Sequence, residues 1–281
     1  MLLQGVMLLW FVQVLVAVAF VAIDVRRTPE SPVMKWGFAI VTLFTGVVGA
    51  FLYVLACREP LPGTHADYVR PRWRQVVGST MHCVAGDGIG ILVGGVVLSA
   101  LGAPAWAEIV AEYALGFLFG WTVFQALFMR SMAGSYGKSL RMTFLPEFVS
   151  MNGLMAGMVA LSLPWRHALG DLGTPGHPEF WFVMSISLTL GFVVSYPLNW
   201  WLVWAGLKHG MMTVPGRSAE PVHAGTGMGG MDMGMSADAH DGAAETTAPS
   251  HASVATRTWM VVVSLVILAA GLTIATALVR L

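Results

Sequence analysis

Long apolar segments separated by short polar stretches run along the whole chain and predict a bundle of transmembrane helices. Each segment has the ~20 residues that cross the hydrocarbon layer of a bilayer as a helix. Proline and charged residues mark the connections, as in 26–30 and 58–63. We therefore expect an all-α, polytopic transmembrane bundle of about seven spanning helices, over residues 2–23, 35–57, 76–101, 107–129, 143–164, 180–206 and 258–280.

The spacing of these segments divides the chain into regions. Residues 1–57 are expected to hold two N-terminal transmembrane helices, and residues 76–206 a four-helix transmembrane core. The stretch 207–257 is rich in Gly, Ala, Ser and Thr and lacks apolar periodicity, so we expect a disordered loop there. A C-terminal transmembrane helix follows over 258–281.

Composition narrows the class of protein. The chain is 56% hydrophobic and only 11% charged, which fits a lipid bilayer and excludes an ordinary soluble domain. Basic residues number 15 and acidic residues 15, without a basic run interleaved with aromatics, so we expect no nucleic acid partner. Cys57 and Cys83 both lie in apolar segments, so a disulfide framework is not expected.

Lys and Arg set the expected orientation, because cytoplasmic loops carry the excess of them. With seven crossings, most basic residues fall on the side of the N-terminus. We therefore expect a bacterial inner-membrane protein with its N-terminus and the 207–257 stretch in the cytoplasm. Arg26 and Arg27, beside the first helix, oppose that assignment.

The 207–257 stretch carries an unusual set of soft and imidazole ligands. Thioethers favour Cu(I)-like ions over Mg, Ca or Zn, so the pattern indicates metal capture. A spacer that happens to contain Met and Gly is the alternative. The candidate ligands are His223, Met228, Met231, Met233, Met235 and His240.

The 76–101 segment places ionisable groups at membrane depth, where such groups usually have a function. Cys83 and Asp87 are one turn apart on the same helical face, above Gly90 and Gly94, which allow a neighbouring helix to approach closely. His82 lies on the adjacent flank and can turn toward the same cavity. A buried core histidine bonded to a carboxylate is the alternative for His82.

The 143–164 segment carries a second polar stripe. Glu147, Met151, Met155 and Met158 recur at steps of four, four and three, and Asn152 lies beside them. Methionine often fills gaps in helical cores, so packing alone is a competing explanation for the stripe. In the 107–129 segment, Glu112 and Gln125 lie near the two ends with a small-residue pair, Gly116 and Gly120, between them, which indicates mainly a packing helix.

Three motifs resemble a family of bacterial membrane proteins known only as a domain of unknown function. They are Met81-His-Cys-Val-Ala-Gly-Asp87, Glu147-x3-Met-Asn-x2-Met-Ala-Gly-Met158, and Asn199-Trp-Trp-Leu202 with Lys208-His-Gly-Met211. The resemblance covers about residues 70–215. It implies a membrane fold without an assigned activity, and Met/His-rich segments in members imply a link to metals.

The leading hypothesis is a pathway for Cu(I), or its mimic Ag(I). Its site would be built by His82, Cys83, Asp87, Glu147, Met151 and Met155, with Asn152 bonding the carboxylates. No ATP-binding motif is present, so movement would be passive or gradient-driven, and we expect no enzyme activity.

Several alternatives stay open. A proton or alkali-ion pathway would use Asp87 and Glu147 without the sulfur groups. A membrane metal chaperone or sensor, with a metal-handling partner protein or a homo-oligomeric assembly, needs the same ligands as transport. Haem ligated by His82 and a methionine is disfavoured, because the spans hold few histidines and the chain lacks Cys-x-x-Cys-His.

Overall fold

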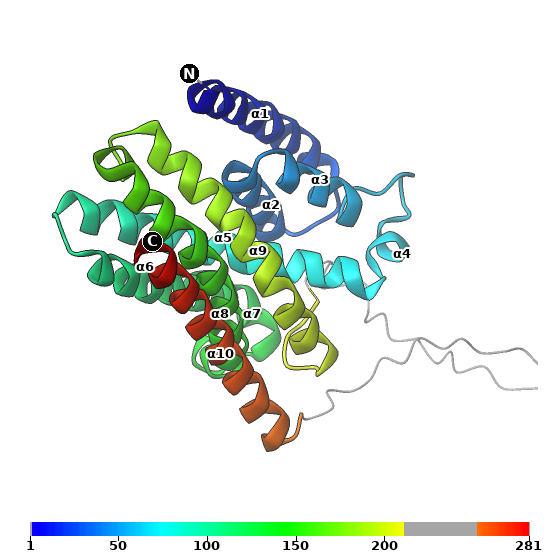
Figure 1. Ribbon diagram of the computed structural model, residues 1–281. Coiled ribbons are helices and arrows are strands. Elements are labelled where there is room, and N and C mark those ends of the chain that lie inside the picture. The colour runs from blue at the N-terminus through cyan, green and yellow to red at the C-terminus, as the bar shows by residue number, and fades with distance from the viewer. Residues whose placement is uncertain (1, 211–251, 281) are drawn as a thin grey trace, which may run out of the picture.

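The computed structural model describes residues 2–210 and 252–280, and throughout these residues it is helical without strands (Figure 1). Within them, six helical segments are long and apolar enough to cross a membrane, which confirms the polytopic helical bundle. The principal helices are α1 (Leu2–Asp24), α5 (Arg72–Ala100), α6 (Ala105–Phe119), α8 (Tyr136–Leu169), α9 (Pro178–Trp204) and α10 (Val254–Arg280).

Small residues let the core helices pack closely. A Cβ at Gly94 of α5 would lie 2.9 Å from the backbone nitrogen of Glu112 in α6. Gly157 of α8 meets the backbone of Gly191 in α9 in the same way, at 2.7 Å. Helix α10 packs along α8, where a Cβ at Gly271 would lie 2.7 Å from the Cα atom of Ala156. The glycines that the sequence marked as contact points on α5 therefore face α6.

The segment 35–57 forms a helical hairpin and not the single helix expected from its apolarity. Helix α2 (Pro32–Thr45) ends at Gly46, whose φ of 61° allows the chain to turn, and α3 (Val47–Ala56) runs back along α2. The Gln13 side chain accepts a hydrogen bond from the Val47 amide at 2.6 Å, which satisfies a free amide at the start of α3. Phe38 and Tyr53 consequently have ring centroids only 5.3 Å apart.

Both ends of this hairpin lie beside the end of α1. Asp24 accepts a hydrogen bond from Tyr53 at 2.8 Å and forms a salt bridge with Arg58 at 2.9 Å. Near the other end of α1, Trp10 donates to Ser185 in the second turn of α9 at 3.0 Å. The start of α1 thus lies near the start of α9, far from the end of α9. The side of the membrane on which the N-terminus and the 207–257 stretch lie stays a prediction.

The helix expected over 107–129 contains a local irregularity. Helix α6 passes into a π-helical turn, η2 (Gly120–Ala126), and continues as α7 (Leu127–Ala133) to the left-handed Gly134. Such π turns widen a helix locally and are common at functional sites. The remaining short elements are η1 (Val25–Arg27), α4 (His65–Val69) and η3 (Gly170–Gly173).

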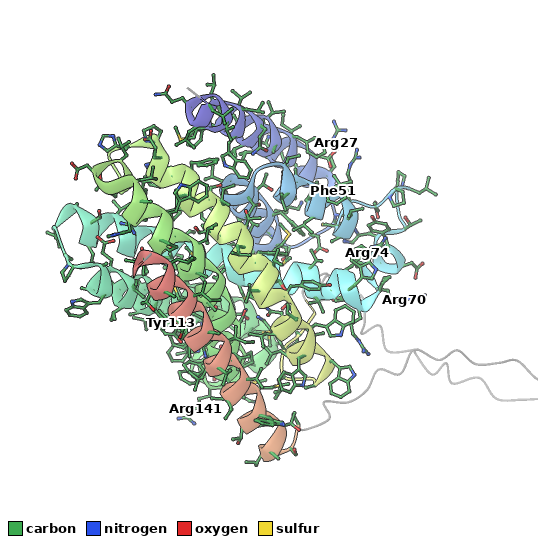
Figure 2. All side chains as sticks on the ribbon, in the orientation of Figure 1. Arg27, Phe51, Arg70, Arg74, Tyr113 and Arg141 are labelled. Carbon is green, nitrogen blue, oxygen red and sulfur yellow. The ribbon has the colours of Figure 1, made fainter. Side chains whose placement is uncertain are left out.

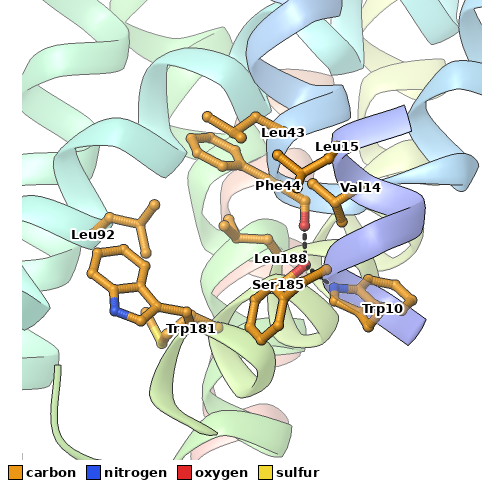
Figure 3. Close-up of a pocket in the computed structure, with 11 residues that line it drawn as sticks. Trp10, Val14, Leu15, Leu43, Phe44, Leu92, Trp181, Ser185 and Leu188 are labelled. Carbon is orange, nitrogen blue, oxygen red and sulfur yellow. Dashed lines mark hydrogen bonds between the residues drawn. The ribbon is translucent and has the colours of Figure 1, made fainter. Parts of the chain in front are cut away.

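An apolar cavity of about 450 Å³ is lined by residues of α1, α2, α5 and α9 (Figure 3). Its hydroxyl group is that of Ser185, which donates to the Phe44 carbonyl and accepts from the Trp10 indole. Because that hydroxyl is already bonded, the cavity offers no group for chemistry. The polar candidates lie deeper in the bundle.

Candidate functional site: a buried polar cluster

Polar side chains from α5, η2, α8 and the segment after α9 meet in the interior of the bundle. Cys83, Asp87 and Glu147 have no exposed surface, and Lys208 is 6% exposed. Charged groups at this depth are expensive unless they have partners, so their arrangement carries information about function. The expectation that the helices carrying Cys83 and Glu147 touch is confirmed.

Cys83 lies at the centre of the cluster. Its thiol donates to Glu147 Oε2 at 3.3 Å. The same sulfur accepts from Gln125 Nε2 and from Lys208 Nζ, each at 2.7 Å. Cys83 therefore joins a carboxylate on α8 to an amide on η2 and an ammonium that follows α9.

Asp87 and Glu147 meet at Gly120, the first residue of the π turn. A Cβ at Gly120 would overlap both Asp87 Oδ1 and Glu147 Oε1, so a larger residue would force the two carboxyl groups to move. Both oxygens of Asp87 and Oε1 of Glu147 are buried, and within the described residues no N–H or O–H group donates to them. Two ionised carboxylates in one dry site repel each other, and a shared cation would relieve that repulsion.

Lys208 supplies positive charge to the cluster. Its ammonium also donates to Asn199 Oδ1 at 2.5 Å, and Asn199 donates to Ser150 Oγ at 2.9 Å. Within the described part of the chain, the charged groups that act on Asp87 are Glu147 and Lys208. If both carboxyl groups are ionised, the single ammonium leaves the site with one negative charge in excess.

The methionine stripe is spread along α8 instead of converging on this cluster. Met151 lies one turn from the carboxylates, with its terminal carbon 2.8 Å from a Cβ placed at Gly116. Met158 packs against Gly191 of α9, and Met155 is buried in the apolar core. Only Met151 is therefore adjacent to the polar cluster.

His82 does not bond a carboxylate, in contrast to the alternative considered from the sequence. Its ring lies against Phe124 and Phe128, with centroid distances of 5.3 and 5.2 Å. Both ring nitrogens are buried and have no hydrogen-bond partner among the described residues. His82 is held in an aromatic environment beside the cluster.

Asn152 binds other partners than the carboxylates, so its expected role was wrong. Its side-chain oxygen accepts from Tyr113 of α6 at 2.7 Å, and its nitrogen donates to Ser264 of α10 at 3.0 Å. Asn152 thus ties three helices together. Its place beside the stripe on α8 turns it away from Glu147.

Sequence reasoning missed Lys208 and Asn199, and it treated Gln125 and Gly120 as parts of a packing helix. Lys208 follows the last apolar turn of α9, so the hydropathy pattern placed it in a loop. The sequence signal for its role was its occurrence in the same motif as Asn199.

The metal ligands proposed from the sequence are only partly assembled. Among residues 2–210 and 252–280, no group of three or more His, Cys, Asp and Glu side chains is arranged to hold a metal ion. The candidates His223, Met228, Met231, Met233, Met235 and His240 lie outside the described residues.

Comparison with known proteins places the cluster within one domain. Residues 72–208 match a family described as a domain of unknown function (DUF4396), which confirms the resemblance to an uncharacterised family. The match begins with α5 and ends at Lys208, so it contains Cys83, Asp87, Gln125, Glu147 and Lys208. No curated protein and no solved structure matches the chain significantly.

Proposed function

We propose that the DUF4396 domain of this chain moves a monovalent cation across the membrane through Asp87, Glu147 and Cys83. The observation that carries the proposal is the meeting of two buried carboxyl groups beside a single ammonium. Asp87 and Glu147 meet at Gly120, and Lys208 balances only one of them. One bound monovalent cation would neutralise the site, and its release would restore the imbalance.

A proton is the cargo that this geometry supports best. The unpartnered oxygens of Asp87 and Glu147 accept hydrogen bonds but cannot donate them when ionised. One proton added there lets one carboxyl donate to the other. This exchange needs no preformed cage of metal ligands.

Cu(I) or Ag(I) is the second candidate, favoured by the sulfur of Cys83 beside Glu147. Met151 lies one turn further along α8 and could add a thioether. A metal ion at Cys83 would have to displace the Lys208 ammonium, which lies 2.7 Å from the sulfur. Lys208 would then act as a tethered cation that competes with the cargo.

Reconstitution in liposomes separates the two cargoes. Proton flux and Ag(I) uptake are measured for the wild type, for Cys83→Ser and for Met151→Leu. A proton pathway predicts flux in all three, because serine keeps a hydroxyl for Glu147 and leucine keeps an apolar side chain. A metal pathway predicts Ag(I) uptake that both substitutions abolish. Absence of both activities in the wild type would reject transport.

Deletion of 223–241 supplies a further arm of the same experiment. For a metal pathway, removing those ligands lowers the apparent affinity for Ag(I) without abolishing its uptake. For a proton pathway, the deletion leaves proton flux unchanged. Metal binding that disappears entirely with the deletion would show that the bundle is not a soft-metal site.

The hairpin of α2 and α3 replaces one of the expected spanning helices, which supports a revised orientation. In it, the 207–257 stretch lies in the cytoplasm of a bacterium and the N-terminus lies outside its inner membrane. Arg27, Arg70 and Arg74 project from one side of the molecule (Figure 2). Most basic residues now share the side of Asp24, and the opposite side has Arg166 and Arg280. Arg26 and Arg27 then lie on the cytoplasmic side, where an excess of Lys and Arg is expected. Phosphatase fusions that are active only outside the cytoplasm would be active at the N-terminus and inactive after Trp204.

A further inference from the structure

A second polar site lies near the end of α5, where α6, α8 and η3 enclose a cavity of about 270 Å³. Arg166 is its basic anchor, and it donates to Glu108 Oε2 at 2.7 Å and to the Gly173 carbonyl at 3.0 Å. Glu112 also lines the cavity, with Oε1 3.6 Å from Arg166 Nη1. The guanidinium is therefore directed mainly at Glu108.

Glu112 is the unsatisfied member of this group. It is 2% exposed, and its Oε1 atom has no hydrogen-bond partner among the described residues. Its ion pair with Arg166 is long, at 3.6 Å, so a cation in the cavity would give this buried oxygen a closer partner. The ionisable side chains that line the cavity are two carboxyl groups, one guanidinium and the imidazole of His167.

The cavity leads toward the central cluster along one face of α6. Glu112, Gly116 and Gly120 recur at steps of four, so they lie in line over two turns, or ~12 Å. The Asp87 and Glu147 carboxylates of the cluster lie against Gly120. At Gly116 a Cβ would lie 2.8 Å from both Ile91 Cγ1 and Met151 Cε, so an apolar contact separates the two sites.

We propose that this cavity is a water-filled vestibule that collects monovalent cations, with Glu112 Oε1, which accepts no hydrogen bond within the described residues, as its receiving group. The inference rests on the proposed function, to which it adds the route from the Arg166 side of the membrane. Ile91 and Met151 form the barrier that a cation must pass to reach Asp87 and Glu147. The ligand that the vestibule would collect is a hydrated proton or another small monovalent cation.

Charge-selective labelling tests the vestibule independently of transport. Ser162 lines the cavity and is 5% exposed, so Ser162→Cys places a thiol inside it. Ser187→Cys is the control, because Ser187 is also buried, at 0% exposed, and does not line the cavity. Burial raises the pKa of the native Cys57 thiol, which keeps its background reaction slow. Labelled sites are identified by peptide mass after reaction with cationic or anionic methanethiosulfonates.

The expected result is that Ser162→Cys reacts and Ser187→Cys does not. The cationic reagent should react roughly tenfold faster than the anionic one, and Glu112→Gln should remove most of that preference. An unreactive Ser162→Cys, or a preference that Glu112→Gln leaves unchanged, would overturn the vestibule.

Proton flux then connects the vestibule to the central site. Glu112→Gln should reduce flux in liposomes, whereas Asp171→Asn, which removes an exposed charge on the same side, should not. Undiminished flux in Glu112→Gln would contradict its role as the receiving group. If the wild type carries no flux but cation-selective labelling is present, the proposed function fails and the cation-collecting vestibule stands.

Discussion

The ammonium of Lys208 lies 2.7 Å from the sulfur of Cys83, although 125 residues separate them in the chain. This contact brings a cation into a cluster that otherwise holds two carboxylates. Lys208 is also the last residue of the family match, so every charged member of the cluster lies within the matched domain. The charge of the site therefore depends on Lys208 as much as on Asp87 and Glu147.

Replacing Lys208 with methionine should destabilise the protein. The change leaves two buried carboxyl groups without a cation, and loss of one partner of a buried ionic group costs about 3 kcal/mol. Thermal unfolding in detergent measures the effect, with the exposed Lys138→Met as the control. Adding Asp87→Asn to Lys208→Met should recover part of the loss, because it removes an unbalanced charge. Strictly additive effects in this double-mutant cycle would contradict the coupling.

Gly120→Ala should disrupt the meeting point of the two carboxylates. The added Cβ would overlap Asp87 Oδ1 and Glu147 Oε1, and forcing them apart should cost about 2 kcal/mol of stability. Gly137→Ala on α8 is the matched control, because nothing lies within 4 Å of its Cβ position. We expect Gly137→Ala to be neutral or slightly stabilising, since alanine favours helix. Equal melting temperatures for the two variants would show that Gly120 does not require its small size.

Asn152→Leu should weaken the attachment of α10 to the core. The substitution removes the acceptor for Tyr113 and the donor to Ser264, so we expect a loss of about 1–3 kcal/mol. Thr276→Val on α10 is the control, since Thr276 is exposed and bonds only its own helix. The measurement is again thermal unfolding in detergent. Unfolding temperatures within the error of the wild type would contradict the tie between α6, α8 and α10.

Hydropathy was sufficient to predict the helical bundle, because the cost of exposing backbone polar groups to lipid leaves few other structures. Helical spacing also placed Cys83 and Asp87 on the face that meets Glu147. Periodicity could not reveal the reversal at Gly46, which depends on a positive φ and on Gln13 from another helix. It could not foresee that Lys208 folds back into the core either, since that contact is tertiary.

The same limit explains the errors at His82 and Asn152. A sequence shows which turn of a helix a side chain occupies but not which neighbouring helix it meets. Phe124 and Phe128 enclose His82, and Asn152 finds Tyr113 and Ser264. Each outcome is set by the packing of α5 or α8 against helices distant in the chain.

The central claim is that a cation crosses the membrane through Asp87 and Glu147. The most direct measurement is cation flux in liposomes under an imposed membrane potential, comparing Asp87→Asn and Glu147→Gln with the exposed control Asp67→Asn. Size-exclusion profiles and melting curves establish that each variant is folded. The account predicts wild-type flux for Asp67→Asn and flux at the level of empty vesicles for folded Asp87→Asn and Glu147→Gln. Undiminished flux in either of those two variants would contradict it.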